Sequence, residues 1–176
     1  MADSQLYQNL SSIVIQAANQ AGGKLTDQDI ENIASLIGKS FGTRPDEVAL
    51  LRVSSDGKNL SFLYPQKMAN VGNIPISTTT GSLAVKTVRD RRGDLVNNFS
   101  TYKHLTVFEA VPLSSETPSA PIRKIMSCPV LVNDDVVGVV QVSRKATAGD
   151  VVGADFTRPQ LNELAAAVMA LGPALT

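Results

Sequence analysis

The stretch VLVNDDVVGVVQVSRK, residues 130–145, decides the fold that we expect for this chain. Two apolar halves flank a short polar turn, which is the pattern of a β-hairpin. A strand of a half-exposed antiparallel sheet alternates apolar and polar residues. Here nearly every position outside the turn is apolar, so both faces of the hairpin should be covered by other parts of the protein.

Amphipathic helices are expected at both ends of the chain. Residues 4–20, 26–41 and 157–171 carry apolar side chains three and four positions apart, the spacing of one helix face. The second and third stretches begin with threonine followed three residues later by Asp or Gln, a capping-box pattern. Gly172-Pro173 is expected to end the third helix.

The middle of the chain predicts short strands and irregular segments. Residues 47–54 and 59–64 are β-prone and are separated by a turn that contains Asp56-Gly57. A short helix is expected at 82–90, and a strand is possible at 94–98. This order of elements is typical of an α+β fold built on an antiparallel sheet: helix, hairpin, irregular middle, long hairpin and helix.

Composition narrows the function classes. A chain of 176 residues with no net charge has the size of one globular domain and no broad electrostatic footprint for nucleic acid or an anionic membrane. Cys128 is the only cysteine and His104 the only histidine, which excludes an internal disulfide and a structural zinc site. Neither a leader segment nor a run of ~20 apolar residues is present. We therefore expect a soluble, cytoplasmic protein.

Residues 27–171 resemble a GAF domain, the small-molecule sensor module of signalling proteins. The resemblance is carried by four segments in this order: EVALLRVSSDGKNLSFLY (47–64), GSLAVKTVRDRRGDLVNN (81–98), CPVLVNDDVVGVVQVSRK (128–145) and DFTRPQLNELAAAV (155–168). It implies five or six antiparallel strands, with the N- and C-terminal helices on one face. Short helices and loops would roof a ligand pocket on the other face. Residues 1–22 would be an N-terminal helix, a possible dimerisation element, and residues 23–176 the GAF-like domain.

The register of the long hairpin selects a pocket floor. If Asp134-Asp135 is a two-residue turn, Cys128 faces Gln141 and Met126 faces Ser143 on one side of the sheet. That face alone carries an amide, a hydroxyl and the thiol, so we expect these four residues to line the pocket. A shift of one residue in the turn would exchange the two faces.

Further candidates for ligand binding come from the middle of the chain. Arg89 and Arg123 would suit an anionic ligand, although solvated surface charge is the alternative. The mixture of aromatic and amide side chains typical of small-molecule pockets is supplied by Asn97, Phe99, Tyr102 and Phe108. An ordinary core with turn asparagines would have the same composition.

Two residues carry their own chemistry. His104 could ligate haem, act as an acid–base group or simply lie at the surface. Cys128 could carry a chromophore or sense oxidants, but inside an apolar strand a free cysteine usually packs as a small hydrophobic group.

Two activities of GAF-like proteins fit the sequence poorly. Cyclic-nucleotide-binding members carry Asn-Lys after the last strand, then Phe, then Asp-Glu, whereas this chain has Arg144-Lys145, Phe156 and Gln160-Leu161. Free methionine sulfoxide reductases use more than one cysteine to form and resolve a disulfide.

We therefore expect a non-enzymatic sensor that binds a small molecule and signals through its terminal helices. The sequence identifies neither the ligand nor a cofactor. Residues 4–20 are expected either to form a homodimer interface or to pack on their own domain. The alternatives are a ligand-free interaction module whose pocket is filled by its own side chains, and an enzyme acting on a small metabolite. Nucleic-acid and membrane partners are not expected.

Overall fold

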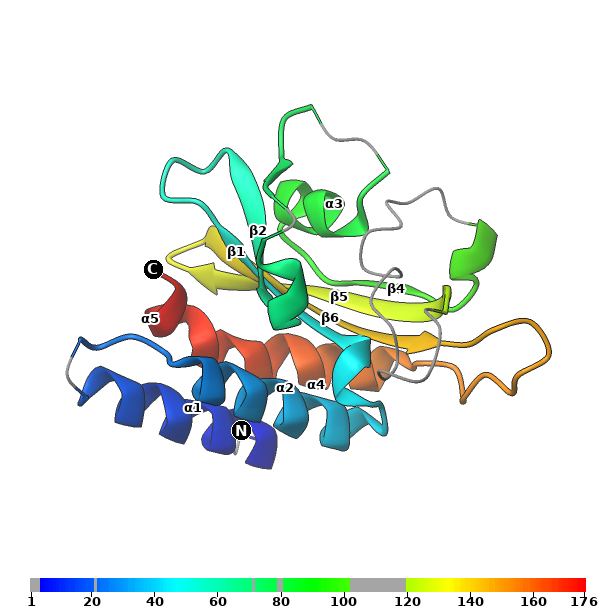
Figure 1. The fold of residues 1–176 in the computed structure, drawn as a ribbon, viewed down its shortest axis with the longest axis horizontal. Coiled ribbons are helices and arrows are strands. Elements are labelled where there is room, and N and C mark those ends of the chain that lie inside the picture. Colours follow the sequence, from blue (N-terminus) through cyan, green and yellow to red (C-terminus); the bar gives the residue numbers. More distant parts are fainter. Residues whose placement is uncertain (1–3, 21, 71, 79–80, 102–119) are drawn as a thin grey trace.

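A computed structural model describes residues 4–20, 22–70, 72–78, 81–101 and 120–176. These residues contain a six-stranded antiparallel sheet in the order β3-β2-β1-β6-β5-β4 (Figure 1). The strands are β1 (Val48–Val53), β2 (Asn59–Tyr64), β3 (Ile74–Pro75), β4 (Asp94–Val96), β5 (Ile122–Val132) and β6 (Asp135–Lys145). The α+β class expected from the order of elements is confirmed, and β5 and β6 are the hairpin that decided it.

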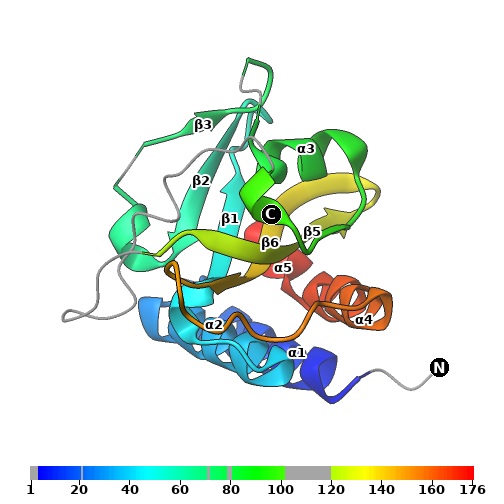
Figure 2. The same cartoon turned by 90° about the vertical axis from the view of Figure 1, so that its right-hand side faces the viewer.

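Helices cover the two faces of the sheet unequally (Figures 1 and 2). We call the more heavily covered face the helix-side face, and its helices are α1 (Gln5–Ala18), α2 (Asp27–Phe41), α4 (Arg158–Val168) and α5 (Gly172–Leu175). The opposite, roof-side face is covered by α3 (Leu83–Asp90). Short 3-10 turns are η1 (Pro45–Glu47), η2 (Gln66–Met68), η3 (Phe99–Thr101) and η4 (Met169–Leu171).

Both capping boxes read from the sequence are present. The Thr26 hydroxyl accepts the backbone N–H of Asp29, whose carboxylate accepts the N–H of Thr26. The same exchange links Thr157 and Gln160 at the start of α4. These contacts involve residues only three positions apart, so local sequence is enough to predict them.

The expected end of the last helix is wrong. The chain continues beyond α4 through η4 into α5 instead of stopping at Gly172-Pro173. Pro173 lies in the first turn of α5, where a missing N–H breaks no intrahelical bond. Gly172 is a packing residue, because a Cβ there would lie 2.7 Å from Cγ2 of Val132.

The apolar stripe of α1 is covered within the chain. Leu6, Leu10 and Val14 are buried in a core shared with α2 and α4, and Ala17 is buried as well. The side chain of Ile15, in contrast, is 60% exposed. Of the two roles expected for this helix, packing on its own domain is the one that the structure contains. Homodimerisation stays a prediction.

The register of the long hairpin differs from the expected one by one residue. Val132 pairs with Asp135, so the turn residues are Asn133 and Asp134, with φ of 51° and 68°. Positive φ at both central positions is the requirement of a type I′ hairpin turn. The register then shifts by one residue between Val130 and Leu131, and the pairs beyond this irregularity are Cys128 with Val140, Ser127 with Gln141, Met126 with Val142 and Ile125 with Ser143.

Two apolar cores lie on the two faces of the hairpin, which confirms that both faces are covered. The helix-side core joins strand residues such as Val140 and Val142 to Leu10, Ile33 and Leu164 of the helices. The roof-side core is smaller and joins the strands to α3 and η3. Its fully buried members include Leu51, Leu60, Val85, Ile125 and Val139.

Candidate functional site

A row of polar side chains crosses the roof-side face of β6. Alternate residues of a strand point to the same face, and the roof-side positions of β6 change from apolar Val139 to Gln141, Ser143 and Lys145. The last three are at most 7% exposed. Buried polar groups in an otherwise apolar sheet require specific partners, and those partners define the candidate site.

Gln141 belongs to a chain of hydrogen bonds that joins β6, β5 and α3. Its Nε2 donates to Oγ of Ser127 at 3.1 Å. Ser127 Oγ in turn lies 2.7 Å from Oγ1 of Thr87, which also contacts the carbonyl oxygen of Leu83 at 2.9 Å. Ser127 and Thr87 are 0% and 1% exposed. The contact fixes α3 above the centre of the roof-side face.

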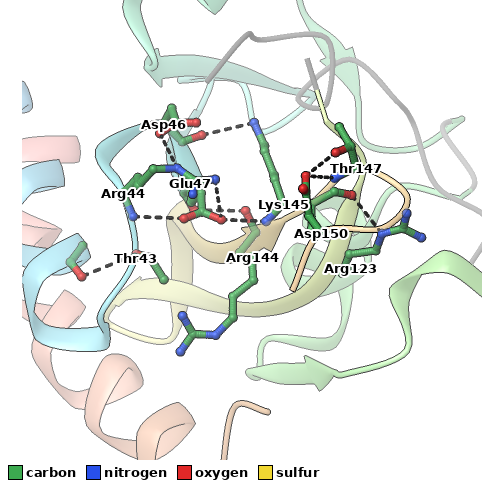
Figure 3. A network of polar contacts seen from close by, with 12 residues as sticks. Thr43, Arg44, Asp46, Glu47, Arg123, Arg144, Lys145, Thr147 and Asp150 are labelled. Carbon is green, nitrogen blue, oxygen red and sulfur yellow. Dashed lines mark hydrogen bonds and ion pairs between the residues drawn. The ribbon is translucent and has the colours of Figure 1, made fainter. Parts of the chain in front are cut away.

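The row ends at a cluster of charged groups, where β6 ends and β1 begins (Figure 3). Ser143 donates to the carbonyl oxygen of Glu47 at 3.1 Å. The buried Glu47 carboxylate accepts the backbone N–H of Lys145 at 2.6 Å and that of Arg44 at 3.0 Å. Nζ of Lys145 donates to the carbonyl oxygen of Asp46 at 3.1 Å. Glu47 therefore holds the turn before β1 against the last residue of β6.

Arg144 points the opposite way from Lys145, to the helix side (Figure 3). Its guanidinium donates to the carbonyl oxygens of Phe41 and Gly42 at the end of α2 and to that of Ala154. It also lies 4.6 Å from the centroid of the Phe156 ring. Arg144 thus ties α2 to the segment that precedes α4 and does not line the roof side.

The two predicted arginines make backbone contacts at the periphery. Arg89 donates to the carbonyl oxygen of Ile76, and Arg123 donates to that of Ala146 at 3.0 Å. Asn97 exchanges two 2.9 Å hydrogen bonds with the backbone of Phe156 and so anchors the end of β4. Each of these side chains has a clear structural role.

Two predicted floor residues lie on the wrong face. Met126 and Cys128 are in the helix-side core, because the register of β5 and β6 shifts by one residue between Val130 and Leu131, which places Cys128 opposite Val140 and not on the face of Gln141. The Cys128 thiol lies 3.8 Å from the carbonyl oxygen of Leu161, and burial raises its pKa to about 12. A protonated, buried thiol is a poor nucleophile.

Of the remaining predicted residues, Gln141 and Ser143 do lie on the roof side, and Phe99 is buried in the roof-side core. Tyr102, His104 and Phe108 lie outside the described residues. Four residues of the site were not predicted: Glu47, Thr87, Ser127 and Lys145. Ser127 carried a usable signal, because it is a hydroxyl residue in the middle of an otherwise apolar strand.

A separate open groove of about 970 Å³ lies at the opposite end of the sheet. It is lined by the β1–β2 turn, the end of α3, the start of β6 and the end of α5. None of the predicted site residues lines it, and it is open to solvent. The buried polar row on the roof side is therefore the better candidate.

Two other kinds of site were sought in the described part of the chain. No group of three His, Cys, Asp or Glu side chains there is placed to hold a metal ion. None of its helices has the length and apolarity that a membrane span requires.

Comparison with solved structures identifies the fold. The sequence itself matches no protein-family model and no curated protein. The GAF domain of a phosphoenolpyruvate-protein phosphotransferase from Acinetobacter superposes with a TM-score of 0.66 at 14% identity, over 99% of this chain and 94% of that one. The corresponding GAF domain from Coxiella burnetii gives a TM-score of 0.63 at 9% identity, over 97% and 94%.

The chain has a GAF-like fold. The same fold includes an enzyme: free methionine-R-sulfoxide reductase from Neisseria meningitidis, solved with its substrate, superposes with a TM-score of 0.60 at 14% identity. The match covers 99% of this chain and 92% of the reductase. The GAF-like fold alone therefore does not separate a regulatory domain from a reductase.

Proposed function

We propose that this chain is a regulatory domain that binds a small molecule against the roof-side face and does not transform it. The observation that carries the proposal is the buried polar row of Gln141 and Ser143 beside Ser127 and Thr87. An apolar core would pack at least as well without these groups, since a buried polar side chain stabilises a fold only when it is fully paired. Polar anchors among apolar walls are what small-molecule sites use.

The comparisons support a site of this kind without naming its ligand. Two of the similar structures are GAF domains from phosphoenolpyruvate-protein phosphotransferases, and the reductase was solved in complex with its substrate. A reductase function suits this chain less well. Its only cysteine, Cys128, is on the helix side of the sheet, and its pKa of about 12 leaves almost no thiolate at neutral pH.

The output would pass through the terminal helices, because α4 packs against the reverse side of β5, α2 packs against that of β1 and β6, and α1 packs on α2 and α4. We also propose a cytoplasmic homodimer, on the basis of the lone buried cysteine and the terminal helices.

A ligand-free interaction module is the second candidate. It is favoured by the roof-side core, in which Leu51, Leu60, Phe62 and Phe99 are already buried by the chain itself. In that case the polar row would serve only to position α3.

Native and denaturing mass spectra of the purified chain test the proposal together with its dimeric state. We expect a native mass of two chains plus a discrete extra mass that is lost on denaturation. Gln141→Leu should lower the occupancy of that extra mass, while Gln16→Leu on the exposed face of α1 should not. A bare native mass that no added metabolite mixture changes would favour the interaction module.

A further inference from the structure

The hydrogen bonds around Ser127 fix which atoms of Gln141 are used. Two hydroxyl protons, those of Thr87 and Ser127, are available for two contacts that contain no N–H group. The 2.9 Å contact to the Leu83 carbonyl oxygen requires the Thr87 proton, since a carbonyl only accepts. The 2.7 Å contact between the two hydroxyls then requires the Ser127 proton.

No hydroxyl proton remains for the third contact, which joins Gln141 to Ser127. The amide nitrogen of Gln141 must therefore donate the proton in this hydrogen bond. This assigns Nε2 of Gln141 to Ser127, at 3.1 Å, and turns Oε1 away from it. Within the described part of the chain, Oε1 accepts no hydrogen bond. The fully buried side-chain atoms without a partner in this part of the chain are Oδ2 of Asp46 and Nε2 of Gln66. Oε1 of Gln141 is not among them, so this oxygen is not completely enclosed.

Gln141 therefore presents a free acceptor from a side chain that is more than nine-tenths buried. The residue is 7% exposed, while its amide nitrogen is held against a fully buried serine. Its cross-strand neighbour on β1 is Ala49, whose side chain carries no hydrogen-bonding group. The orientation is rigid, because the Thr87–Ser127 pair holds the nitrogen end.

The charges near this acceptor disfavour an anion. The cations predicted for an anionic ligand, Arg89 and Arg123, donate to backbone carbonyl oxygens. The nearest charged side chains along the row are Lys145, which donates to a carbonyl oxygen, and the buried carboxylate of Glu47. A carboxylate or phosphate placed against Oε1 would meet another oxygen acceptor, so that contact could not be a hydrogen bond, and burying the charge there would be costly.

We propose that the ligand is an uncharged molecule that donates an N–H or O–H to Oε1 of Gln141 from an otherwise apolar frame. This inference rests on the proposed function, because it names the ligand class of the same site. It replaces the expectation of an anionic ligand by one of a neutral hydrogen-bond donor, such as a lactam, an imide or an azole.

The test uses matched triplets of small molecules and ¹⁵N-labelled protein. Uracil, 1,3-dimethyluracil and orotate share one frame, and indazole, 1-methylindazole and indazole-3-carboxylate share another. In each triplet the second compound lacks the N–H donor and the third adds a negative charge. The side-chain NH₂ signals of Gln141 are identified by their absence from the spectrum of Gln141→Leu.

We expect the neutral N–H compounds to shift the Gln141 signals and to bind about tenfold more tightly than their methylated partners, the usual worth of one hydrogen bond. The preference should disappear in Gln141→Leu and persist in Gln16→Leu. If Gln141→Leu does not fold, the comparison of methylated and unmethylated partners on the wild-type chain decides alone.

The outcomes separate the two proposals. Binding by the carboxylates or the methylated compounds at the Gln141 signals, with no preference for N–H, would overturn this inference and leave the proposed function standing. No binding by any compound at millimolar concentration would overturn the proposed function and this inference with it.

Discussion

Ser127→Ala tests whether the hydrogen-bond chain is as important to the fold as its geometry indicates. The substitution removes the 3.1 Å bond from Gln141 and the 2.7 Å bond to Thr87 at a residue that is 0% exposed. Each bond contributes about 1 kcal/mol net, and each group left buried without a partner costs a further ~1 kcal/mol or more. We expect a loss of about 3 kcal/mol in the free energy of unfolding.

The assay is urea unfolding followed by circular dichroism, with Ser12→Ala as the control. The Ser12 hydroxyl makes a hydrogen bond too, to the carbonyl oxygen of Gln8, but Ser12 is exposed on α1, so its loss should change stability by less than ~0.5 kcal/mol. In a double-mutant cycle, Gln141→Leu should cost less in the Ser127→Ala background, because the amide is no longer paired there. Equal costs in both backgrounds, or a Ser127→Ala variant as stable as the control, would refute the reasoning.

Three further substitutions test the packing around the site. Arg144→Lys should cost about 2 kcal/mol, because lysine loses the guanidinium fork to the backbone and the stacking on Phe156; an unchanged urea midpoint would contradict this. Gly138→Ala should cost about 2 kcal/mol or more, since its Cβ would lie 2.7 Å from the carbonyl oxygen of Leu51, and a wild-type melting curve would disprove it. Burial raises the pKa of Cys128 from 9.0 to about 12, so above pH 9 only the unfolded chain loses this proton. Stability should therefore fall by about 1.4 kcal/mol per pH unit up to pH 12, and unfolding curves of Cys128→Ala should show a shallower fall.

The elements that sequence predicts well are those fixed by neighbouring residues. The capping boxes at Thr26 and Thr157 and the Asp56-Gly57 turn depend on contacts within a few positions, and all are present. The α+β arrangement followed from the order of these elements. Gln141 and Ser143 lie on the roof side, as the sequence predicted, and their role in binding a ligand stays a prediction.

The register of the hairpin could not be predicted for a physical reason. Asn133, Asp134 and Asp135 all tolerate the backbone of a tight turn, so residue type does not choose the turn pair. Nor does any residue mark the register shift between Val130 and Leu131, which is what exchanges the two faces. A hydrophobic pattern normally fixes register, but here both faces of the hairpin are apolar and a one-residue slip exposes nothing. Only packing against helices far away in sequence decides it, and with it the face on which Cys128 lies.

The hydrogen-bond partners of Gln141 could not be predicted from the sequence either. Thr87 and Ser127 are 40 residues apart, and their contact exists only because α3 crosses the strands at that point. What the sequence did show was the anomaly itself: a serine and a glutamine inside strands that need no polar residue. Such anomalies are informative because a polar group in a core lowers stability unless another group satisfies it.

The alternation of β6 gives the proposed sensor a direct route from ligand to output. Gln141 faces the roof side, while its chain neighbours Val140 and Val142 are 1% and 0% exposed in the helix-side core beneath α2 and α4. A close-packed interior has no free volume to absorb a displacement. A ligand that pulls Gln141 by its carbonyl oxygen would therefore move Val140 and Val142 against the helices. The polar row and the helix-side core lie on the two faces of β6. A displacement of this one strand would therefore be enough to couple them.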